Sequence, residues 1–315
     1  MENKLCFVQF THPGGEHQPD KGKDYKSWNT GKHQRKFMLI DGDVVTDNCL
    51  ISNMPLLIWG EWEPGSKIVK TFEQQKGDYP KYIHRPYLDI SQPFPRQNTD
   101  PYVFGSQFHY CCCKQCRGKN LSQLARLEKG SIILFGSTIN QNKTTAYFAL
   151  DTVFVVGSYI AYNHENAIGR LKGNVSDEYF EITIKSIYDD SFPEQNIDNL
   201  NPQMRCYYGA SYDNPVYDMY SFVPAKIYND DNCGFERVKL TNADITCLTN
   251  NLNAAPKITS TIIIADNIGK WQKLKEILRN QGFSEGVRFT FDSEDSTSSG
   301  KIFENSGKAS SCSKC

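Results

Sequence analysis

The sequence predicts an α+β fold in which β-strands dominate. Two apolar segments, residues 131–137 and 146–156, flank a polar loop, which is the pattern of a β-hairpin that lines a barrel or sandwich core. The 17 Tyr and 18 Phe of this 315-residue chain also favour strands, where aromatic side chains are enriched. The longest helix is expected at residues 269–281, where apolar side chains recur at helical spacing and Gly282 follows.

The first half of the chain begins with three expected strands. Residues 5–10, 37–40 and 56–62 are apolar runs of strand length. Residues 71–96 form a Pro- and Tyr-rich connection that leads toward the hairpin. A long connection beside a β core often carries function, so this segment is of interest for a site.

A short helix is expected at residues 120–129, immediately before the hairpin. Asn120 can cap the helix, Gln123 lies three residues later, and leucines recur at helical spacing. Gly130 follows at the position where a left-handed residue commonly ends a helix.

The second half of the chain has weaker patterns. Residues 179–187 alternate as a strand does, residues 205–228 form an aromatic β region, and residues 262–265 form a short apolar strand before the long helix. We therefore expect a barrel-type domain at residues 1–160, a second α+β part at residues 161–292 and a Ser-rich, disordered tail at residues 293–315.

The composition excludes some classes of protein. The formal net charge is −1, so the chain lacks the bulk positive charge of a general polyanion binder, and any nucleic-acid contact must be local. The N-terminus does not resemble a signal peptide, and no apolar segment has the length of a membrane span. We therefore expect a cytoplasmic protein with no membrane partner, whose eleven cysteines are mostly reduced thiols.

The first group of candidate catalytic residues lies at residues 11–17, THPGGEH. Two glycines after a proline force a loop that brings His12, Glu16 and His17 close together. Two histidines and a carboxylate suit a metal site or an acid–base cluster. The alternative is a polar loop held by its own hydrogen bonds.

Residues 20–36 form a basic segment around an aromatic side chain. Trp28 and Asn29 lie among lysines, His33 and Arg35. Positive charge interleaved with an aromatic ring is what a surface needs in order to contact phosphates and stack on a base. The alternative is a solvated charged face.

The expected strand at residues 56–62 contains two tryptophans and a carboxylate. Period-two alternation places Trp59 and Glu61 on one face and Trp62 on the other. A carboxylate beside an aromatic ring could read a base edge or act as an acid–base group. The alternative is a tryptophan that anchors the sheet with the glutamate at its rim.

The densest cysteine cluster is the sequence CCCKQC at residues 111–116. Cys113 and Cys116 have zinc-knuckle spacing, and Cys312 and Cys315 repeat that spacing at the C-terminus, so the two pairs could form a zinc site. The pairs lie far apart in the sequence, however, and buried thiols that pack as small apolar side chains explain the first cluster. We expect no metal and no cofactor, with zinc at Cys113 and Cys116 as the alternative.

The cysteine run 111–113, the leucine-containing helix at 121–127, the segment KGSIILFGS at 129–137 and the returning strand FALDTVFVV at 148–156 follow one another in a recognisable order. This order resembles the layout of PUA-like domains, the superfamily of the EVE, ASCH and YTH readers, and most of all the bacterial nucleotide-modification-associated domains. The resemblance implies a small β-barrel with short helices and a pocket for a base, often modified, that is extruded from its strand. Aromatic walls, polar groups and a local basic strip would serve such a pocket; the chain offers them at Trp28, Trp59, Trp62, Asn98, Asp100, Tyr102 and residues 32–35.

Two functions follow as hypotheses. The first is binding of a nucleotide, a modified base or a nucleic acid, in a bacterial DNA-modification or defence system. The second is a hydrolase or transferase acting on a nucleotide or nucleic acid, with acid–base groups drawn from His12, Glu16, His17, Glu61 and Asp100. A histidine and a carboxylate in hydrogen-bond contact in one cleft would favour the enzyme. A third option is an interaction scaffold whose aromatic surfaces bind another protein.

Overall fold

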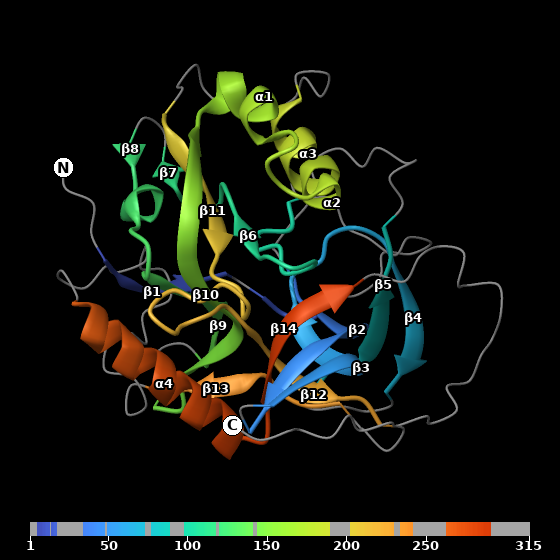
Figure 1. The fold of residues 1–315 in the computed structure, drawn as a ribbon. Coiled ribbons are helices and arrows are strands. Elements are labelled where there is room, and N and C mark those ends of the chain that lie inside the picture. The colour runs from blue at the N-terminus through green and yellow to red at the C-terminus, as the bar shows by residue number, and fades with distance from the viewer. Residues whose placement is uncertain are drawn as a thin grey trace.

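The structure is a computed structural model that describes residues 5–12, 14–17, 34–47, 49–72, 77–88, 98–117, 120–140, 144–189, 202–229, 234–241 and 263–290. Two mixed β-sheets of six strands each make up most of it, together with short helices and one long helix (Figure 1). The expected α+β, strand-rich fold is confirmed.

The first sheet contains the predicted hairpin. In spatial order its strands are β1 (Phe7–Thr11), β9 (Ile132–Ile139), β10 (Tyr147–Tyr162), β11 (Met204–Gly209) and β6 (His109–Tyr110), with β13 (Val238–Leu240) also paired to β10. β1 runs parallel to β9, and the other pairs are antiparallel. Because β1 and β9 run parallel, the C-terminal ends of the two strands lie at the same end of the sheet.

The second sheet is built around the long hairpin of β2 and β3. Its strands in order are β14 (Ser284–Thr290), β12 (Val223–Ile227), β3 (Cys49–Gly60), β2 (Lys36–Thr46), β5 (Tyr82–Pro86) and β4 (Ser66–Thr71). β14 also pairs with β2, so the sheet folds back on itself at this end. The pairings describe two sheets, and the PUA-like barrel stays a prediction.

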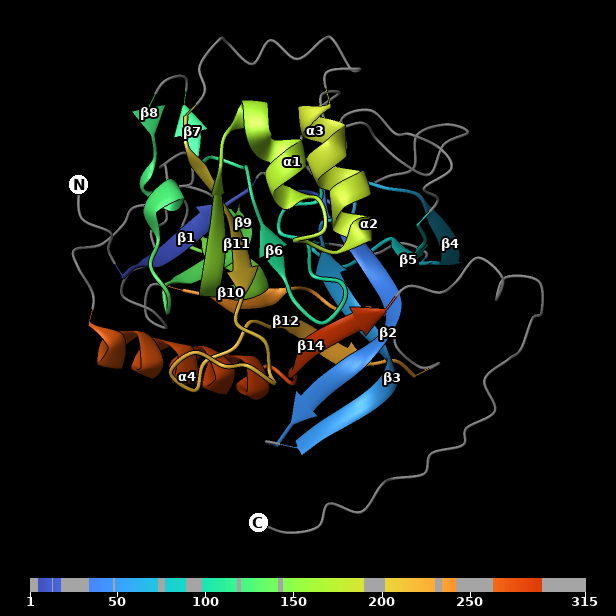
Figure 2. The ribbon, with the colours of Figure 1, turned by 45° about the horizontal axis from the view of Figure 1, so that its top comes forward.

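The helices lie on two sides of the molecule. The short elements η3 (His164–Asn166), α1 (Ala167–Leu171), α2 (Asp177–Tyr179), η4 (Phe180–Lys185) and α3 (Ser186–Tyr188) follow β10 and cluster at its far end. The long helix α4 (Ile264–Asn280) lies at the opposite side of the molecule (Figure 2), next to β13 in Figure 1. The expected helix at residues 269–281 is therefore confirmed, and it begins five residues earlier than expected.

Two expected strands of the second half are wrong. Residues 179–187 are helical, in α2, η4 and α3, where the Ser176 hydroxyl caps the segment by accepting the Tyr179 N–H at 3.2 Å. Nearly every side chain of this segment is buried, so its alternating pattern did not mark one buried face. Ile264 and Ala265, expected in a strand, form the first turn of α4.

The expected helix at residues 120–129 is reduced to one turn. The structure has two-residue strands β7 (Cys116–Arg117) and β8 (Asn120–Leu121), followed by the 3-10 turn η2 (Gln123–Arg126), which Ser122 caps. The Tyr207 hydroxyl accepts the Leu127 N–H and donates to the Leu124 carbonyl, so β11 takes the hydrogen bonds that another helical turn would use. Gly130 is left-handed as predicted, with φ at +88°.

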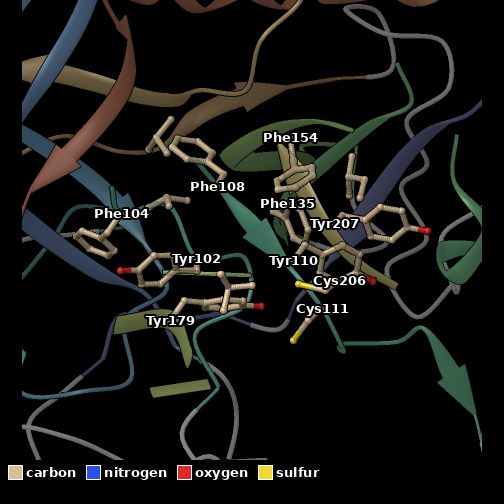
Figure 3. Packing of buried hydrophobic residues seen from close by; sticks show 14 of the residues in the cluster. Tyr102, Phe104, Phe108, Tyr110, Cys111, Phe135, Phe154, Tyr179, Cys206 and Tyr207 are labelled. Carbon is tan, nitrogen blue, oxygen red and sulfur yellow. The ribbon is translucent and has the colours of Figure 1, made fainter. Parts of the chain in front are cut away.

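An aromatic core packs between β6, β9, β10 and β11. Tyr110 stacks on Tyr207 with ring centroids 5.8 Å apart, and Phe135 and Phe154 lie behind them (Figure 3). Cys111 lies beside Cys206 below these rings (Figure 3). This core fixes the end of β6, from which the cysteine run begins.

Candidate functional site

The candidate site is a cluster of three side chains, His12, Glu61 and Cys113, each of which lies just after a strand. His12 follows β1, Glu61 follows β3, and Cys113 lies in the turn after β6. His12 and Cys113 belong to the first sheet and its following loop, whereas Glu61 belongs to the second. The site is therefore assembled only when the two sheets pack together.

His12 connects the other two residues. Its Nδ1 lies 3.0 Å from Glu61 Oε2, which leaves Nε2 for the side-chain hydrogen bond with Cys113. The imidazole and the carboxylate are almost completely buried, and the imidazole packs edge-on against the Phe10 ring. Cys113 is partly exposed. A cysteine, a histidine and a carboxylate in this order form the arrangement of a catalytic triad.

The turn that carries Cys113 is held by the carboxylate of Asp100. This carboxylate accepts the backbone N–H groups of Cys111, Cys112 and Cys113 at distances of 2.9, 3.0 and 3.0 Å. The Tyr110 hydroxyl donates to the Cys113 carbonyl at 2.6 Å. These hydrogen bonds hold the backbone of the turn, and so they fix the position of Cys113, as a catalytic side chain requires.

Asn98 contacts both neighbouring sulfurs. Its Nδ2 lies 3.0 Å from Cys113 Sγ and 3.3 Å from Cys112 Sγ. Its backbone N–H donates to Glu63 Oε2 at 2.7 Å, which anchors the residue. An amide N–H aimed at the Cys113 sulfur stabilises negative charge there.

The protonation of the site follows from these contacts. The pKa of the Cys113 thiol is lowered well below its ordinary value by the Cys112 side-chain hydrogen bond and by His12, against the effect of burial. The pKa of Cys112 is raised by its hydrogen bonds with Cys111 and Cys113, so Cys112 keeps its proton. Burial lowers the pKa of His12, but the charge of Glu61 and the hydrogen bonds to Cys113 and Glu61 outweigh burial and raise it. Both shifts favour the form of the pair in which Cys113 is a thiolate and His12 an imidazolium.

Asp100 has a different role from the other carboxylates. Burial, followed by the charge of Cys113, raises its pKa to about 7, although the three backbone N–H groups lower it. It faces the backbone of the cysteine turn, where its two oxygens accept three N–H groups. Asp100 therefore shapes the loop that presents the nucleophile.

A buried ionic network supports Glu61 from behind. Arg35 Nη1 lies 3.3 Å from Glu61 Oε2, and Arg35 Nε donates to Asp151 Oδ2 at 2.5 Å. Arg237 continues the network, with Nη1 3.4 Å from Asp151 Oδ1 and Nη2 3.0 Å from Asp78 Oδ1. Arg35, which the sequence suggested as a ligand contact, is 1% exposed and orients the carboxylate of the site.

Glu16 and His17 do not join His12. The Glu16 carboxylate accepts the backbone N–H groups of Lys81 and Tyr82, which ties its loop to the start of β5. The His17 ring packs against His84 with centroids 6.0 Å apart. The structure thus separates the predicted cluster, and only His12 of the three reaches the site.

The aromatic candidates are inside the protein. Trp59 donates its indole N–H to the Phe235 carbonyl at 2.8 Å, and Trp62 donates to the Gly65 carbonyl at 2.9 Å. Tyr102 is buried and packs on Tyr179 with ring centroids 5.0 Å apart. These contacts are those of core anchors, which was the alternative reading for the tryptophans. Trp28, Asn29, His33, Cys312 and Cys315 lie outside the described residues.

One group of side chains offers ligand atoms for a cation. Asp100, Cys112 and Cys113 each provide one atom, and these atoms lie within 4.8 Å of one another. A structural zinc site needs about four protein ligands, and the Asp100 carboxylate is already occupied by three backbone N–H groups. Cys116 faces elsewhere, with its sulfur 3.9 Å from Met204 Sδ. The hydrogen bond to His12 makes thiol chemistry the better fit for Cys113.

Sequence reasoning named His12 and Glu61 but missed Cys113 as their partner. The cysteine was interpreted as packing or as a zinc ligand, because it was judged by its cysteine neighbours alone. The residue types alone could have suggested it, because His12, Glu61 and the cysteines at 111–113 supply the base, the carboxylate and the nucleophile of a thiol triad. Their distances along the chain gave no indication that they meet.

A comparison of the chain with protein-family profiles, curated proteins and solved structures finds no match. Of the helices in the described ranges, none combines the length and the apolar character that a membrane crossing requires. The function must therefore be argued from the site.

Proposed function

We propose that this protein is a thiol-dependent enzyme, a hydrolase or group transferase, in which Cys113 is the nucleophile. The observation that carries the proposal is the chain of contacts from Cys113 through His12 to Glu61. It meets the geometric requirement for an activated cysteine, namely a base in hydrogen-bond contact that a third group orients.

The three residues have separate roles. The Cys113 thiolate attacks an electrophilic carbon, a carbonyl or amidine carbon, and forms a C–S bond while the carbon takes up negative charge. The His12 imidazolium gives its proton to the leaving group as the bond to that group breaks. Neutral His12 then takes a proton from water or an acceptor alcohol or amine, which displaces the sulfur and restores the thiolate. Glu61 holds the ring through Nδ1 and stabilises its charged form.

Asn98 supports the first step. Its Nδ2 donates to the Cys113 sulfur and so stabilises the thiolate before attack. In this proposal the same N–H group can also stabilise the negative charge that develops beside the sulfur when the C–S bond forms. Amide donors at this position commonly contribute about 3–4 kcal/mol to such reactions.

The proposed substrate class is a nucleotide or a modified base with an electrophilic carbon, within a PUA-like barrel fold. The support is the resemblance of residues 108–156 to PUA-like domains together with the partly exposed Cys113 beside this segment. Binding of a nucleotide without catalysis remains the alternative. Native mass spectrometry of the purified protein tests for a bound nucleotide, because a retained nucleotide adds its own mass to that of the protein.

The experiment that tests the reaction uses p-nitrophenyl acetate, a generic acyl donor. We expect a burst of p-nitrophenol and an acetyl group on Cys113, found by peptide mass spectrometry. Cys113→Ser removes both, and Cys116→Ser, a matched change three residues away, retains them. Acetyl transfer to other cysteines only, or an unchanged burst in Cys113→Ser, would overturn the proposal.

A further inference from the structure

Cys112 forms no bond to the substrate in the proposed reaction, although its side chain hydrogen bonds to the nucleophile. Its sulfur and the Cys113 sulfur share one donor, Asn98 Nδ2, and lie within 4.8 Å of each other. Both cysteines are partly exposed, and both are free thiols. Two adjacent thiols of which one is activated by a histidine form a pair that an oxidant can couple.

We propose that Cys113 is a site of modification by peroxides and that Cys112 is its resolving thiol, so that oxidation closes a reversible Cys112–Cys113 disulfide. The inference rests on the reactive Cys113 of the proposed function and adds a mode of regulation to the same site.

The chemistry is balanced with hydrogen peroxide as the oxidant. The Cys113 thiolate attacks one peroxide oxygen, the O–O bond breaks, and hydroxide leaves and is protonated to water. Cys113 is then a sulfenic acid. The Cys112 sulfur attacks the Cys113 sulfur, the S–O bond breaks, and the second oxygen leaves as water with the Cys112 proton. Two thiols and one peroxide thus give one disulfide and two waters.

The other cysteines near the site are less suited to this role. Cys111 is fully buried and hydrogen bonds to the Tyr179 side chain. Cys116 directs its sulfur to Met204 Sδ at 3.9 Å. Cys112, in contrast, shares the Asn98 Nδ2 donor with Cys113. Its position therefore makes Cys112 the best placed thiol to form a disulfide with oxidised Cys113.

The proposed disulfide is expected to be easily reduced. Adjacent Cα atoms are about 3.8 Å apart across a trans peptide, less than the about 4.4–6.8 Å that most disulfides span. Closure also has to shift a turn whose N–H groups are bound by Asp100. A strained, accessible disulfide is labile and suits reversible regulation. While it is closed, Cys113 is not a thiolate and cannot attack a substrate carbon, and it is protected from irreversible oxidation.

The test treats the full-length protein with hydrogen peroxide and maps the products after trypsin digestion. Trypsin cuts after Arg96 and after Lys114, so a Cys112–Cys113 disulfide stays within the peptide 97–114, whereas a Cys113–Cys116 disulfide joins two peptides. We expect the first product in the wild type, with complete recovery of iodoacetamide labelling of Cys113 after dithiothreitol. Cys112→Ser should instead accumulate sulfinic acid on Cys113 and lose this recovery. Cys116→Ser is the control and should behave as wild type.

The outcomes separate the inference from the function on which it rests. A disulfide to Cys116, or full recovery in both Cys112→Ser and Cys112→Ala, would overturn the role of Cys112 even if acetyl transfer to Cys113 is intact. A Cys112–Cys113 disulfide in a protein that forms no acetyl-enzyme would support the inference and overturn the proposed hydrolase. Urea unfolding of the Cys112 variants, compared with wild type, reports whether they are folded.

Discussion

Replacement of Glu61 by glutamine removes the charge that supports His12 without removing the bulk of the side chain. Glu61 Oε2 lies 3.0 Å from His12 Nδ1 and 3.3 Å from Arg35 Nη1, and all three side chains are buried. The variant leaves the two cationic partners in place with a neutral amide between them. Its first consequence is a lower pKa of His12, because the Glu61 charge raises that pKa. The Glu61 charge also raises the pKa of Cys113 directly, but the contacts with His12 that lower this pKa are larger, so loss of the imidazolium gives a net higher pKa of the Cys113 thiol.

The magnitude follows from the distance. Two unit charges at 3.0 Å and an effective dielectric constant of about 20 interact by about 5 kcal/mol, before any desolvation is counted. Opposite charges at such distances commonly move a pKa by about 1–3. Because a pKa change of one corresponds to a factor of about ten, we expect the alkylation rate of Cys113 at about pH 6 to fall by about 10- to 100-fold. The fold should lose about 1–3 kcal/mol, since a charged hydrogen bond becomes a neutral one.

The assay is the rate of Cys113 alkylation by iodoacetamide as a function of pH, read from the peptide 97–114, together with urea unfolding. The wild type should alkylate well below the pH at which an ordinary thiol ionises, at about 8.5. Glu61→Gln should move this profile to higher pH, and Glu236→Gln, a change in a partly exposed pair with Lys239, should not. An identical profile in Glu61→Gln and wild type would refute the role of Glu61.

Four further outcomes follow from the structure. Asp151→Asn removes the carboxylate between Arg35 and Arg237 and should lower the free energy of unfolding by about 3–5 kcal/mol in urea, because a buried charge loses its partner. Gly130→Ala should cost at least about 1 kcal/mol by the same measurement, since φ is +88° and the new Cβ would lie 2.8 Å from the Tyr217 ring. Trp62→Phe should cost about 1 kcal/mol through the lost bond to Gly65 and leave any nucleotide affinity unchanged in calorimetry, because the ring is buried. The folded pKa of Asp100 is raised to about 7, so its stabilising contribution is full below its unfolded pKa of about 4 and is lost as pH rises through about 7; the stability of wild type relative to Asp100→Asn should fall across this range.

The strand-rich fold could be predicted because its signals are local. The strand before His12 and the two strands of the β9–β10 hairpin contain short apolar runs, and α4 carries apolar side chains at helical spacing. Residues 179–187 were predicted wrongly because most of their side chains are buried, so the apolar positions do not mark a single face of a strand. A capping serine three residues before Tyr179 was the better signal. The short helix before the hairpin was overestimated because Tyr207, more than 75 residues away, takes its hydrogen bonds.

The site was only half predictable for a related reason. His12 and Glu61 were chosen for their chemistry, and their pairing depends on two sheets that come together across 49 positions of sequence. The role of Cys113 depends on Asp100 and Asn98, which orient its backbone and sulfur through contacts that have no sequence period. Trp59 and Trp62 had the residue type of a stacking surface, but their indole N–H groups bind backbone carbonyls in the core.

The buried charges around the site favour the ionised form of the cysteine–histidine pair. Arg35 and Arg237 bring two positive charges, and Glu61, Asp151 and Asp78 bring three negative charges in contact with them. This excess of one negative charge is neutralised when His12 carries a proton at Nε2, next to Cys113. The proton that His12 needs can come from the thiol, which leaves the thiolate in contact with Asn98 Nδ2. The ionic network that joins the two sheets therefore also sets the charge of the nucleophile, and loss of the Asp151 carboxylate should favour neutral His12 and so raise the pKa of Cys113, as well as weaken the fold.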